Sequence, residues 1–262
     1  MPSRANPPKK RLGQHFLKDP NTARIVAEGV GGDDVVLEVG PGRGFLTVFL
    51  AERARLVHAV ELDPDVMPEL RRAVRAFDNV AIHEADALRF DYGSLEPVPD
   101  RLVANLPYNV ASPLVLRLLE EVRSLRTLRF MVQLEVARRM AGSRGTKDYG
   151  SYAVLVQLLA AVRIAHRVSP NVFDPPPRVY SAVVEMERRS EVLQPGEYRG
   201  VKELVLAAFK SRRKRLVNNL PGGVRGEASR ALATLGFGPD ARAEELSPED
   251  FVALYRELSG ET

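Results

Sequence analysis

The chain has 262 residues, of which 45% are hydrophobic and 27% are charged, and it contains no cysteine. These proportions are typical of a soluble globular protein, and the length allows one large domain, or a large one and a small one. The absence of cysteine excludes disulfides and thiolate metal sites, and we predict no metal site. No apolar run approaches the roughly 20 residues of a membrane span, and no secretory signal begins at Met1, so we expect a cytoplasmic protein.

The net charge of +4 is small, but basic residues gather in two segments that are far apart in the sequence. The first is an N-terminal arm over residues 1–19, in which no acid precedes Asp19. Such clusters attract phosphate backbones, although each could instead be a solvated tail or a solvated helix face. The basic residues that we select as candidate RNA contacts are Lys9, Lys10, Arg11, Lys210, Arg212, Arg213, Lys214 and Arg215.

After the arm, short apolar segments alternate with segments of helical spacing. The pair Asp19-Pro20 indicates a helix start, and the chain then predicts an alternation of strands and helices, which implies a parallel sheet with right-handed crossovers. A last strand over 180–186 is placed antiparallel beside the others. The remaining expected strands are 35–39, 56–60, 80–82, 102–104 and 128–132, and the expected helices follow residue 45 and cover 64–77 and 114–119.

The alternation stops near residue 190. Residues 191–196 read as a linker, and helical spacing returns over 201–208. Ser247-Pro248-Glu249-Asp250 has the composition of a helix start, with Ser at the cap and acids in the first turn. We therefore expect an α/β domain over 20–190 and a small all-helical domain over 191–262.

Polar residues follow four of the expected strands. They are Gly40, Glu61, Asp86 and Asn105, and ligands bind at the carboxyl ends of the strands in parallel sheets. Glycines at 40, 42 and 44 would let the backbone approach a ligand closely, although the loop could also be a structural turn. Phe45 stands where a dinucleotide fingerprint has its third glycine.

The two carboxylates suit different parts of an adenosine. Glu61 could accept both hydroxyl protons of a ribose, and Asp86 could accept from an adenine amino group, although either could instead cap a helix. Together with the glycine loop they describe a pocket for an adenosine-containing cofactor. S-adenosylmethionine enzymes show this order of elements, and nicotinamide dehydrogenases share its first two members.

Asn105-Leu106-Pro107-Tyr108 has the form (D/N)-P-P-(Y/F), with Leu at the second position. That form is typical of methyltransferases that act on amino groups conjugated to a ring, whose nitrogen lone pair is delocalised. The side-chain oxygen of Asn105 and a backbone carbonyl at Leu106 could accept the two amino hydrogens, which favours a pyramidal nitrogen. Pro107 stiffens the turn, and Tyr108 offers a face on which a base can stack.

With these motifs the chain resembles the small-subunit rRNA adenine dimethyltransferases, the KsgA family. The resemblance runs nearly end to end, and it implies a Rossmann-like S-adenosylmethionine-dependent methyltransferase sheet followed by a small helical domain. It also implies dimethylation of two adjacent adenosines near the 3′ end of 16S rRNA during late assembly of the small subunit. The matching stretches are 11–17 (RLGQHFL), 38–42 (EVGPG), 105–109 (NLPYN), 172–181 (VFDPPPRVYS) and 212–218 (RRKRLVN).

The resemblance also assigns roles to single residues. His15 and Leu17 would contact the cofactor. The family often has Asn at the position of His15, so the implied contact there is one that the main chain can make. Phe173 would be a second stacking residue opposite Tyr108, although core packing also fits it. The full set of implied cofactor contacts is His15, Leu17, Gly40, Gly42, Glu61, Asp86, Ala87 and Asn105, with Leu88 beside the adenine ring.

The expected partner is 16S rRNA in an immature small subunit, which a monomer would bind through the basic arm and the 210–215 cluster. The small C-terminal domain would help to select the rRNA structure by shape.

Three alternatives remain open. The first is an erythromycin-resistance type methyltransferase of large-subunit rRNA, and the second is a non-catalytic RNA-binding assembly factor. The third is a nicotinamide oxidoreductase, which the displaced third glycine and the Asn105–Tyr108 motif disfavour.

Overall fold

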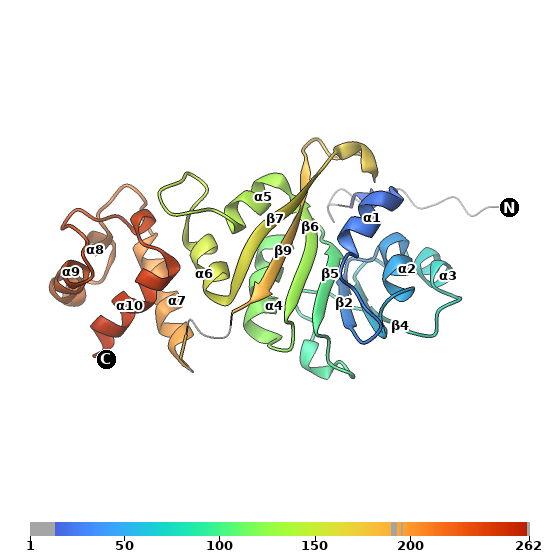
Figure 1. The fold of residues 1–262 in the computed structure, drawn as a ribbon, viewed down its shortest axis with the longest axis horizontal. Coiled ribbons are helices and arrows are strands. Elements are labelled where there is room, and N and C mark those ends of the chain that lie inside the picture. The colour runs from blue at the N-terminus through green and yellow to red at the C-terminus, as the bar shows by residue number, and fades with distance from the viewer. Residues whose placement is uncertain (1–13, 190–192, 195, 261–262) are drawn as a thin grey trace. The chain divides into compact units, whose positions relative to one another are not determined.

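The computed structural model describes residues 14–189, 193–194 and 196–260 (Figure 1). The predicted RNA contacts at Lys9, Lys10 and Arg11 therefore lie outside the described residues. Two compact units divide the chain: the first includes residues up to 137 and 163–188, and the second includes 138–162 and residues from 189 onward. The second unit thus contains a segment that the sequence analysis assigned to the α/β domain. None of the helices in the described ranges is long and apolar enough to cross a membrane.

A seven-stranded sheet forms the first unit, and its strand order is β4-β3-β2-β5-β6-β9-β7. The strands β2 to β6 run parallel to one another, whereas β9 runs antiparallel to β6 with Val184 opposite Phe130. The expected antiparallel strand over 180–186 is therefore confirmed. The bounds are β2 (Val35–Val39), β3 (Leu56–Glu61), β4 (Val80–Glu84), β5 (Arg101–Asn105), β6 (Thr127–Gln133), β7 (Ala160–Val168) and β9 (Ser181–Arg188).

The connections between the parallel strands place helices on both faces of the sheet. The crossover from β2 to β3 contains α2 (Phe45–Ala51), and the crossover from β5 to β6 contains α4 (Ala111–Glu121). These crossovers run in opposite directions along the sheet, so right-handedness puts α2 and α4 on opposite faces. The strand order reverses between β2 and β5, which is where open α/β sheets bind ligands. Helix α3 (Met67–Ala73) is shorter than the expected helix over 64–77.

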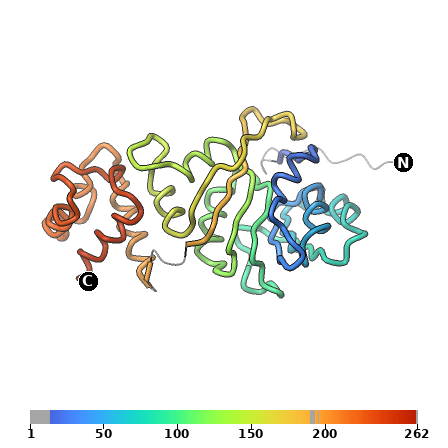
Figure 2. Tube along the Cα trace, viewed as in Figure 1, coloured from blue at the N-terminus to red at the C-terminus, as the bar shows by residue number. Residues whose placement is uncertain are grey.

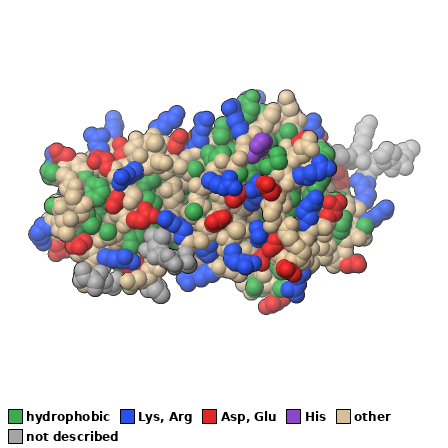
Figure 3. All heavy atoms as spheres, viewed as in Figure 1, with side chains coloured by type: hydrophobic (Ala, Val, Ile, Leu, Met, Phe, Trp, Pro, Cys, Tyr) green, Lys and Arg blue, Asp and Glu red, His purple; other side chains and the backbone are tan. Residues whose placement is uncertain are grey.

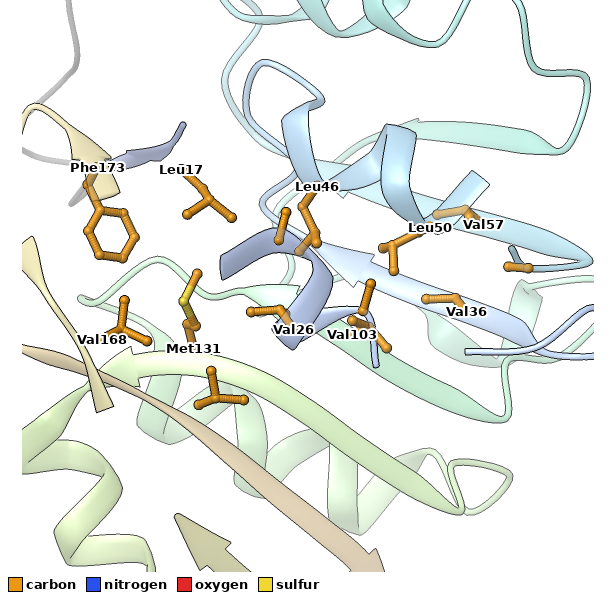
Figure 4. Packing of buried hydrophobic residues seen from close by; sticks show 14 residues of the cluster. Leu17, Val26, Val36, Leu46, Leu50, Val57, Val103, Met131, Val168 and Phe173 are labelled. Atoms are coloured by element: carbon orange, nitrogen blue, oxygen red, sulfur yellow. The ribbon is translucent and has the colours of Figure 1, made fainter. Parts of the chain in front are cut away.

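Apolar side chains fill the space between the sheet and α1 (Pro20–Val26) and α2. Val26, Leu46 and Leu50 from the helices meet Val103 and Met131 from the strands, and all of them are buried (Figure 4). Burial of each such side chain contributes about 1.5–3 kcal/mol. This packing holds the carboxyl ends of β2 and β5 in fixed positions.

The start of the described chain is tied to a segment about 155 residues later. Strand β1 (Phe16–Leu17) pairs antiparallel with β8 (Phe173–Asp174), and the Lys18 amide donates to the Val172 carbonyl at 2.9 Å. Figure 2 shows this blue segment beside the golden one. The N-terminal residues from 14 onward are therefore part of the first unit.

The second unit is helical. Its last helix begins at Ser247, whose hydroxyl accepts from the Asp250 amide while the Asp250 carboxylate accepts from the Ser247 amide, as the sequence predicts. Glu197 and Arg256 form a two-pronged ion pair at 2.7 and 2.9 Å. The helices that lie wholly in this unit are α6 (Ser151–Leu159), α7 (Glu197–Ala208), α8 (Leu216–Asn219), α9 (Arg225–Thr234) and α10 (Pro248–Ser259), and α5 (Leu134–Met140) leads into it.

Candidate active site

A cavity of about 490 Å³ opens at the carboxyl ends of the parallel strands. Its volume lies in the range of small-molecule sites, and its walls come only from the first unit. The predicted site residues that line it are His15, Leu17, Gly40, Gly42, Glu61, Asp86, Ala87, Asn105, Leu106 and Tyr108. The structure thus brings together residues that the sequence separates by up to 93 positions.

The glycine loop after β2 forms one wall. Gly40 and Gly42 have φ angles of +71° and +56°, a region that L side chains rarely adopt. A Cβ on Gly40 would lie 3.0 Å from the Pro107 ring, and one on Gly42 would lie 2.9 Å from the Phe16 ring. Both glycines therefore allow the loop to approach its neighbours, and the guanidinium of Arg43 closes the far side by lying over Phe16 at 4.4 Å.

Glu61 ends β3 and is held by main-chain groups. Its Oε2 accepts from the Gly42 amide at 2.9 Å, and its Oε1 accepts from the amides of Leu62 and Asp63 at 2.8 Å each. Burial raises the pKa of the carboxyl, and these three hydrogen bonds oppose the rise. The side chain is thus fixed in one orientation, and Oε2, which accepts only one of the three bonds, keeps an acceptor position for a ligand hydroxyl.

Asp86 follows β4 and is half-exposed. Its Oδ1 accepts from the Leu88 amide at 2.9 Å, as in a turn cap, while Oδ2 lies 3.9 Å from Arg89. Capping and ligand binding are compatible, because a carboxylate has about four acceptor positions. Ala87 lines the cavity beside it, whereas Leu88 is not among the lining residues.

A third carboxyl, Glu38, lies in the floor of the cavity. Burial raises its pKa to about 8, and the charge of Glu61 contributes to the rise. Its Oε2 is buried and has no hydrogen-bond partner among the described residues. Glu38 is therefore largely protonated at neutral pH, and its Oε2 remains able to form a hydrogen bond at this site.

Asn105, at the end of β5, has the arrangement that an acceptor of amino hydrogens needs. Its Nδ2 donates to the main-chain carbonyl of His15 at 3.1 Å. Its Oδ1 is buried and accepts no hydrogen bond from the described parts of the chain. A buried unsatisfied acceptor is costly unless a ligand completes it.

Tyr108 stands beside Asn105 and is anchored on two sides. Its hydroxyl shares a 2.5 Å hydrogen bond with the Ser181 hydroxyl, and its ring contacts the His15 imidazole, with centroids 5.3 Å apart. The His15 Nδ1 lies 2.7 Å from the Pro175 carbonyl oxygen. Burial raises the pKa of the Tyr108 phenol, so the side chain is neutral.

Comparison with known proteins identifies the family. Residues 5–259 match the family described as "Ribosomal RNA adenine dimethylase". The chain is 76% identical over 252 residues to the ribosomal RNA small subunit methyltransferase A of Rubrobacter xylanophilus, covering 96% of this chain and 95% of the relative. It is 43% identical over 265 residues to the protein of that name from Mycobacterium leprae, covering 97% and 87%. The chain belongs to the ribosomal RNA adenine dimethylase family.

Two solved structures agree with this assignment. A dimethyladenosine transferase from Plasmodium falciparum superposes with a TM-score of 0.77 at 25% identity, covering 92% of this chain and 96% of the other. The 23S rRNA methyltransferase ErmE superposes with a TM-score of 0.72 at 29% identity, covering 93% and 99%. The expected Rossmann-like methyltransferase fold and the resemblance to the KsgA family are therefore confirmed, and the dimethylase depends on S-adenosylmethionine.

Phe173 does not lie where a second stacking residue would be expected. Its ring is fully buried and packs in the core with Leu17, Val168 and Met131 (Figure 4). The residue is therefore part of the core in this conformation, and its ring does not face the cavity. Asp174, the next residue, lines the cavity instead.

The second basic cluster also differs from expectation, because it is not helical. It lies in the turn between α7, which ends at Ala208, and α8, which begins at Leu216. Arg212 donates to the Lys147 carbonyl at 2.9 Å and pairs with Glu244 at 2.9 Å, and Arg215 pairs with Asp240 at 2.6 Å. Three exposed basic side chains of this turn form no ion pair within the described ranges: Lys210, Arg213 and Lys214.

Three contributors to the site had no assigned role in the sequence analysis. Phe16 packs over Gly42, Ser181 anchors Tyr108, and the Gln14 amide donates to the Asp63 carboxylate at 2.7 Å. The three contributors, Phe16, Ser181 and Gln14, lie inside stretches that carry the family resemblance, whereas Asp63 does not. Their spacing in the sequence gives no signal for these contacts, since each joins elements that meet only in the folded chain.

Proposed function

We propose that this dimethylase transfers methyl groups to the N6 amino groups of two adjacent adenosines in the 3′-terminal hairpin loop of 16S rRNA. The expected substrate is the rRNA of an immature small ribosomal subunit, and the protein acts in the cytoplasm as a monomer. The single observation that carries the chemistry is Asn105, whose buried Oδ1 lacks a partner among the described residues and lies at the cavity.

The cavity fits S-adenosylmethionine on its own geometry. The loop at Gly40 and Gly42 lines the cavity with main-chain atoms and packs closely on Pro107 and Phe16. Glu61 and Asp86 offer acceptors for ribose hydroxyls and for an adenine amino group. Glu38 adds an unsatisfied buried oxygen. When bound, this cofactor supplies an electrophilic methyl group on a positively charged sulfur.

The protein's own part in the reaction is to position the amine. Asn105 Oδ1 accepts one amino hydrogen, and a main-chain carbonyl of the Leu106 turn accepts the other. Both bonds favour a pyramidal nitrogen with its lone pair available. Because the nitrogen loses its proton readily once it is methylated, no strong general base is needed, and positioning and electrostatics carry the rate enhancement.

Tyr108 is the stacking surface for the target base, since the bond to Ser181 and the contact with His15 fix its ring. Phe173 would have to turn out of the core to contact the other face of the base. The target adenosine must be unstacked to reach such a site, and a loop nucleotide meets this need at low cost. The exposed basic residues at 210–215 would bind RNA backbone in the second unit.

Methyl-transfer assays with two RNAs test the proposal. The purified protein is given small ribosomal particles that lack the two dimethyladenosines, and separately naked large-subunit rRNA. We expect transfer of four methyl groups per small particle and none to the large-subunit rRNA. Product on the large-subunit rRNA alone would assign the chain the activity named for ErmE, and RNA binding without transfer to either would make it a non-catalytic assembly factor.

A further inference from the structure

An exposed tyrosine lies one residue from the site. Tyr180 is 46% exposed, although it directly precedes Ser181, whose hydroxyl holds Tyr108. Its main chain is fixed, because its carbonyl accepts from the Leu134 amide at 2.9 Å. A large apolar ring in such a place is not explained by core packing.

The ring of Tyr180 has a cationic neighbour. The Arg167 guanidinium lies 4.0 Å from the ring centroid, in the geometry of a cation–π contact. Arg178 and Val179 precede the tyrosine, and both are exposed. We call Arg167, Arg178, Val179 and Tyr180 the Tyr180 shelf.

The chain segment that leads to Tyr180 is mostly basic. Between residues 160 and 180 the basic side chains are Arg163, Arg167 and Arg178, and the only acid is Asp174. Glu185 neutralises Arg163 at 2.7 Å. On the face drawn in Figure 3, blue and green side chains lie together along the upper edge of the first unit. An aromatic ring beside unpaired arginines is the combination that binds single-stranded nucleic acid.

We propose that the Tyr180 shelf binds the nucleotide next to the target adenosine, with its base stacked on Tyr180 and its phosphate near Arg167 and Arg178. This inference rests on the proposed rRNA substrate. The position is suitable because β9 begins at Ser181 opposite Gln133, the last residue of β6, so Tyr180 lies at the same edge of the sheet as the cavity. A base held at Tyr108 leaves its neighbour in reach of Tyr180.

The proposed target sequence has two adjacent adenosines. The shelf would bind one of them while the other is methylated at Tyr108. Arg167 holds the Tyr180 ring from one side, which reduces the entropy lost when a base stacks on the rest of it. The shelf therefore acts on substrate binding and contributes nothing to the methyl-transfer step itself.

Steady-state kinetics of the full chain on unmethylated small ribosomal particles test the shelf. We expect Tyr180→Ala to raise KM for the particle about tenfold, with kcat and the calorimetric affinity for S-adenosylmethionine within twofold of the native protein. Tyr180→Phe keeps the stacking face and should have native KM, and Arg167→Ala should raise KM by a smaller factor. Arg55→Ala is the matched control, since this exposed arginine precedes β3 at the amino ends of the parallel strands, away from the cavity.

The outcomes separate the shelf from the proposed function. If the native protein methylates the particles and Tyr180→Ala leaves KM within twofold, the shelf is wrong while the function stands. Equal losses in Tyr180→Ala and Tyr180→Phe would also overturn it, because the hydroxyl and not the ring would be responsible. If the native protein methylates no small-subunit RNA, the proposed function itself fails.

Discussion

Asn105 Nδ2 donates a hydrogen bond to the main-chain carbonyl of His15 at 3.1 Å. A carbonyl oxygen can only accept, so this bond places the amide nitrogen toward the N-terminal segment and leaves Oδ1 on the other side. That segment is itself fixed by the pairing of β1 with β8. The orientation of the proposed catalytic acceptor is therefore set by residues about 90 positions earlier in the chain.

Replacing the acceptor should stop the reaction. We expect Asn105→Ala to lower kcat for methyl transfer by about 10²-fold or more, the size of the loss when one preorganised polar group at a reacting centre is removed. Particle binding, measured by filter retention, should stay within twofold. Asn171→Ala is the control, because Asn171 is exposed. Full turnover by Asn105→Ala would refute the role of this side chain.

The bond to His15 can be tested separately with Asn105→Asp. The substitution keeps an oxygen acceptor but replaces the donor with a second oxygen, which would face the His15 carbonyl and be repelled by it. We expect a lower kcat than in the native protein and a lower free energy of unfolding by urea. A native rate in Asn105→Asp would mean that the Nδ2 bond does not orient the acceptor.

The glycine loop should be intolerant of a methyl group. Gly42→Ala puts a Cβ within 2.9 Å of the Phe16 ring at a φ of +56°, so the ring must shift away from the cavity. We expect the calorimetric Kd for S-adenosylmethionine to rise about tenfold or more, because overpacking of this kind costs about 1–3 kcal/mol and the displaced Phe16 ring lines the cavity.

Gly29→Ala is the matched control for that variant. Gly29 also has a positive φ of +81°, but its added Cβ would meet only the end of Arg101 at 3.9 Å. The control should lose stability to a similar degree and keep the native cofactor affinity. An equal loss of affinity in both variants would show that strain, and not the Phe16 contact, is responsible.

Glu38 should make the cofactor-free protein less stable as pH rises. Its folded-state pKa of about 8 lies above the ordinary value of 4.5 because the carboxyl is buried. The unfolded chain therefore releases this proton at lower pH than the folded chain, and the free energy of unfolding falls between about pH 4.5 and 8. Glu38→Gln has no proton to lose there.

Urea unfolding of the native protein and of Glu38→Gln at pH 5 and at pH 8.5 measures the effect. The difference, variant minus native, should become more positive at the higher pH, because other titrating groups cancel in the comparison. A difference that is independent of pH would contradict the buried, protonated state of Glu38.

The 210–215 turn should contribute to RNA affinity through charge. Each phosphate contact that is lost reduces the slope of log K against log salt by about 0.7–0.9, so Arg213→Ala with Lys214→Ala should flatten the slope by about 1.5. Arg212→Ala is the comparison, because Arg212 binds Glu244 and the Lys147 carbonyl. That variant should lower the free energy of unfolding instead. An unchanged slope in the double variant would remove the turn from the RNA interface.

The sequence was informative where local chemistry decides the structure. Strands such as Val35–Val39 are mostly apolar and end at glycine, an acid or Asn, so their existence and the placing of Gly40, Glu61 and Asn105 at one edge follow from the pattern. The Ser247 cap is equally local, since its hydrogen bonds join residues three apart.

Features that depend on distant partners were missed. Strand β7 is mostly exposed and lacks a clear apolar alternation, so only its position beside β9 makes it a strand. The segment 210–215, which follows the expected helical spacing over 201–208, was expected to be helical, but Arg212 and Arg215 bond to residues outside the segment. Burial of Phe173 depends on β1, which is only two residues long.

The most direct test of the account is mass mapping of methylated adenosines in 16S rRNA from cells that lack this protein. We predict that two adjacent adenosines in the 3′-terminal hairpin loop are unmethylated there, and that the native gene restores four methyl groups while the Asn105→Ala form restores none. Dimethylation of both adenosines in cells without the protein, or its restoration by Asn105→Ala, would contradict the account.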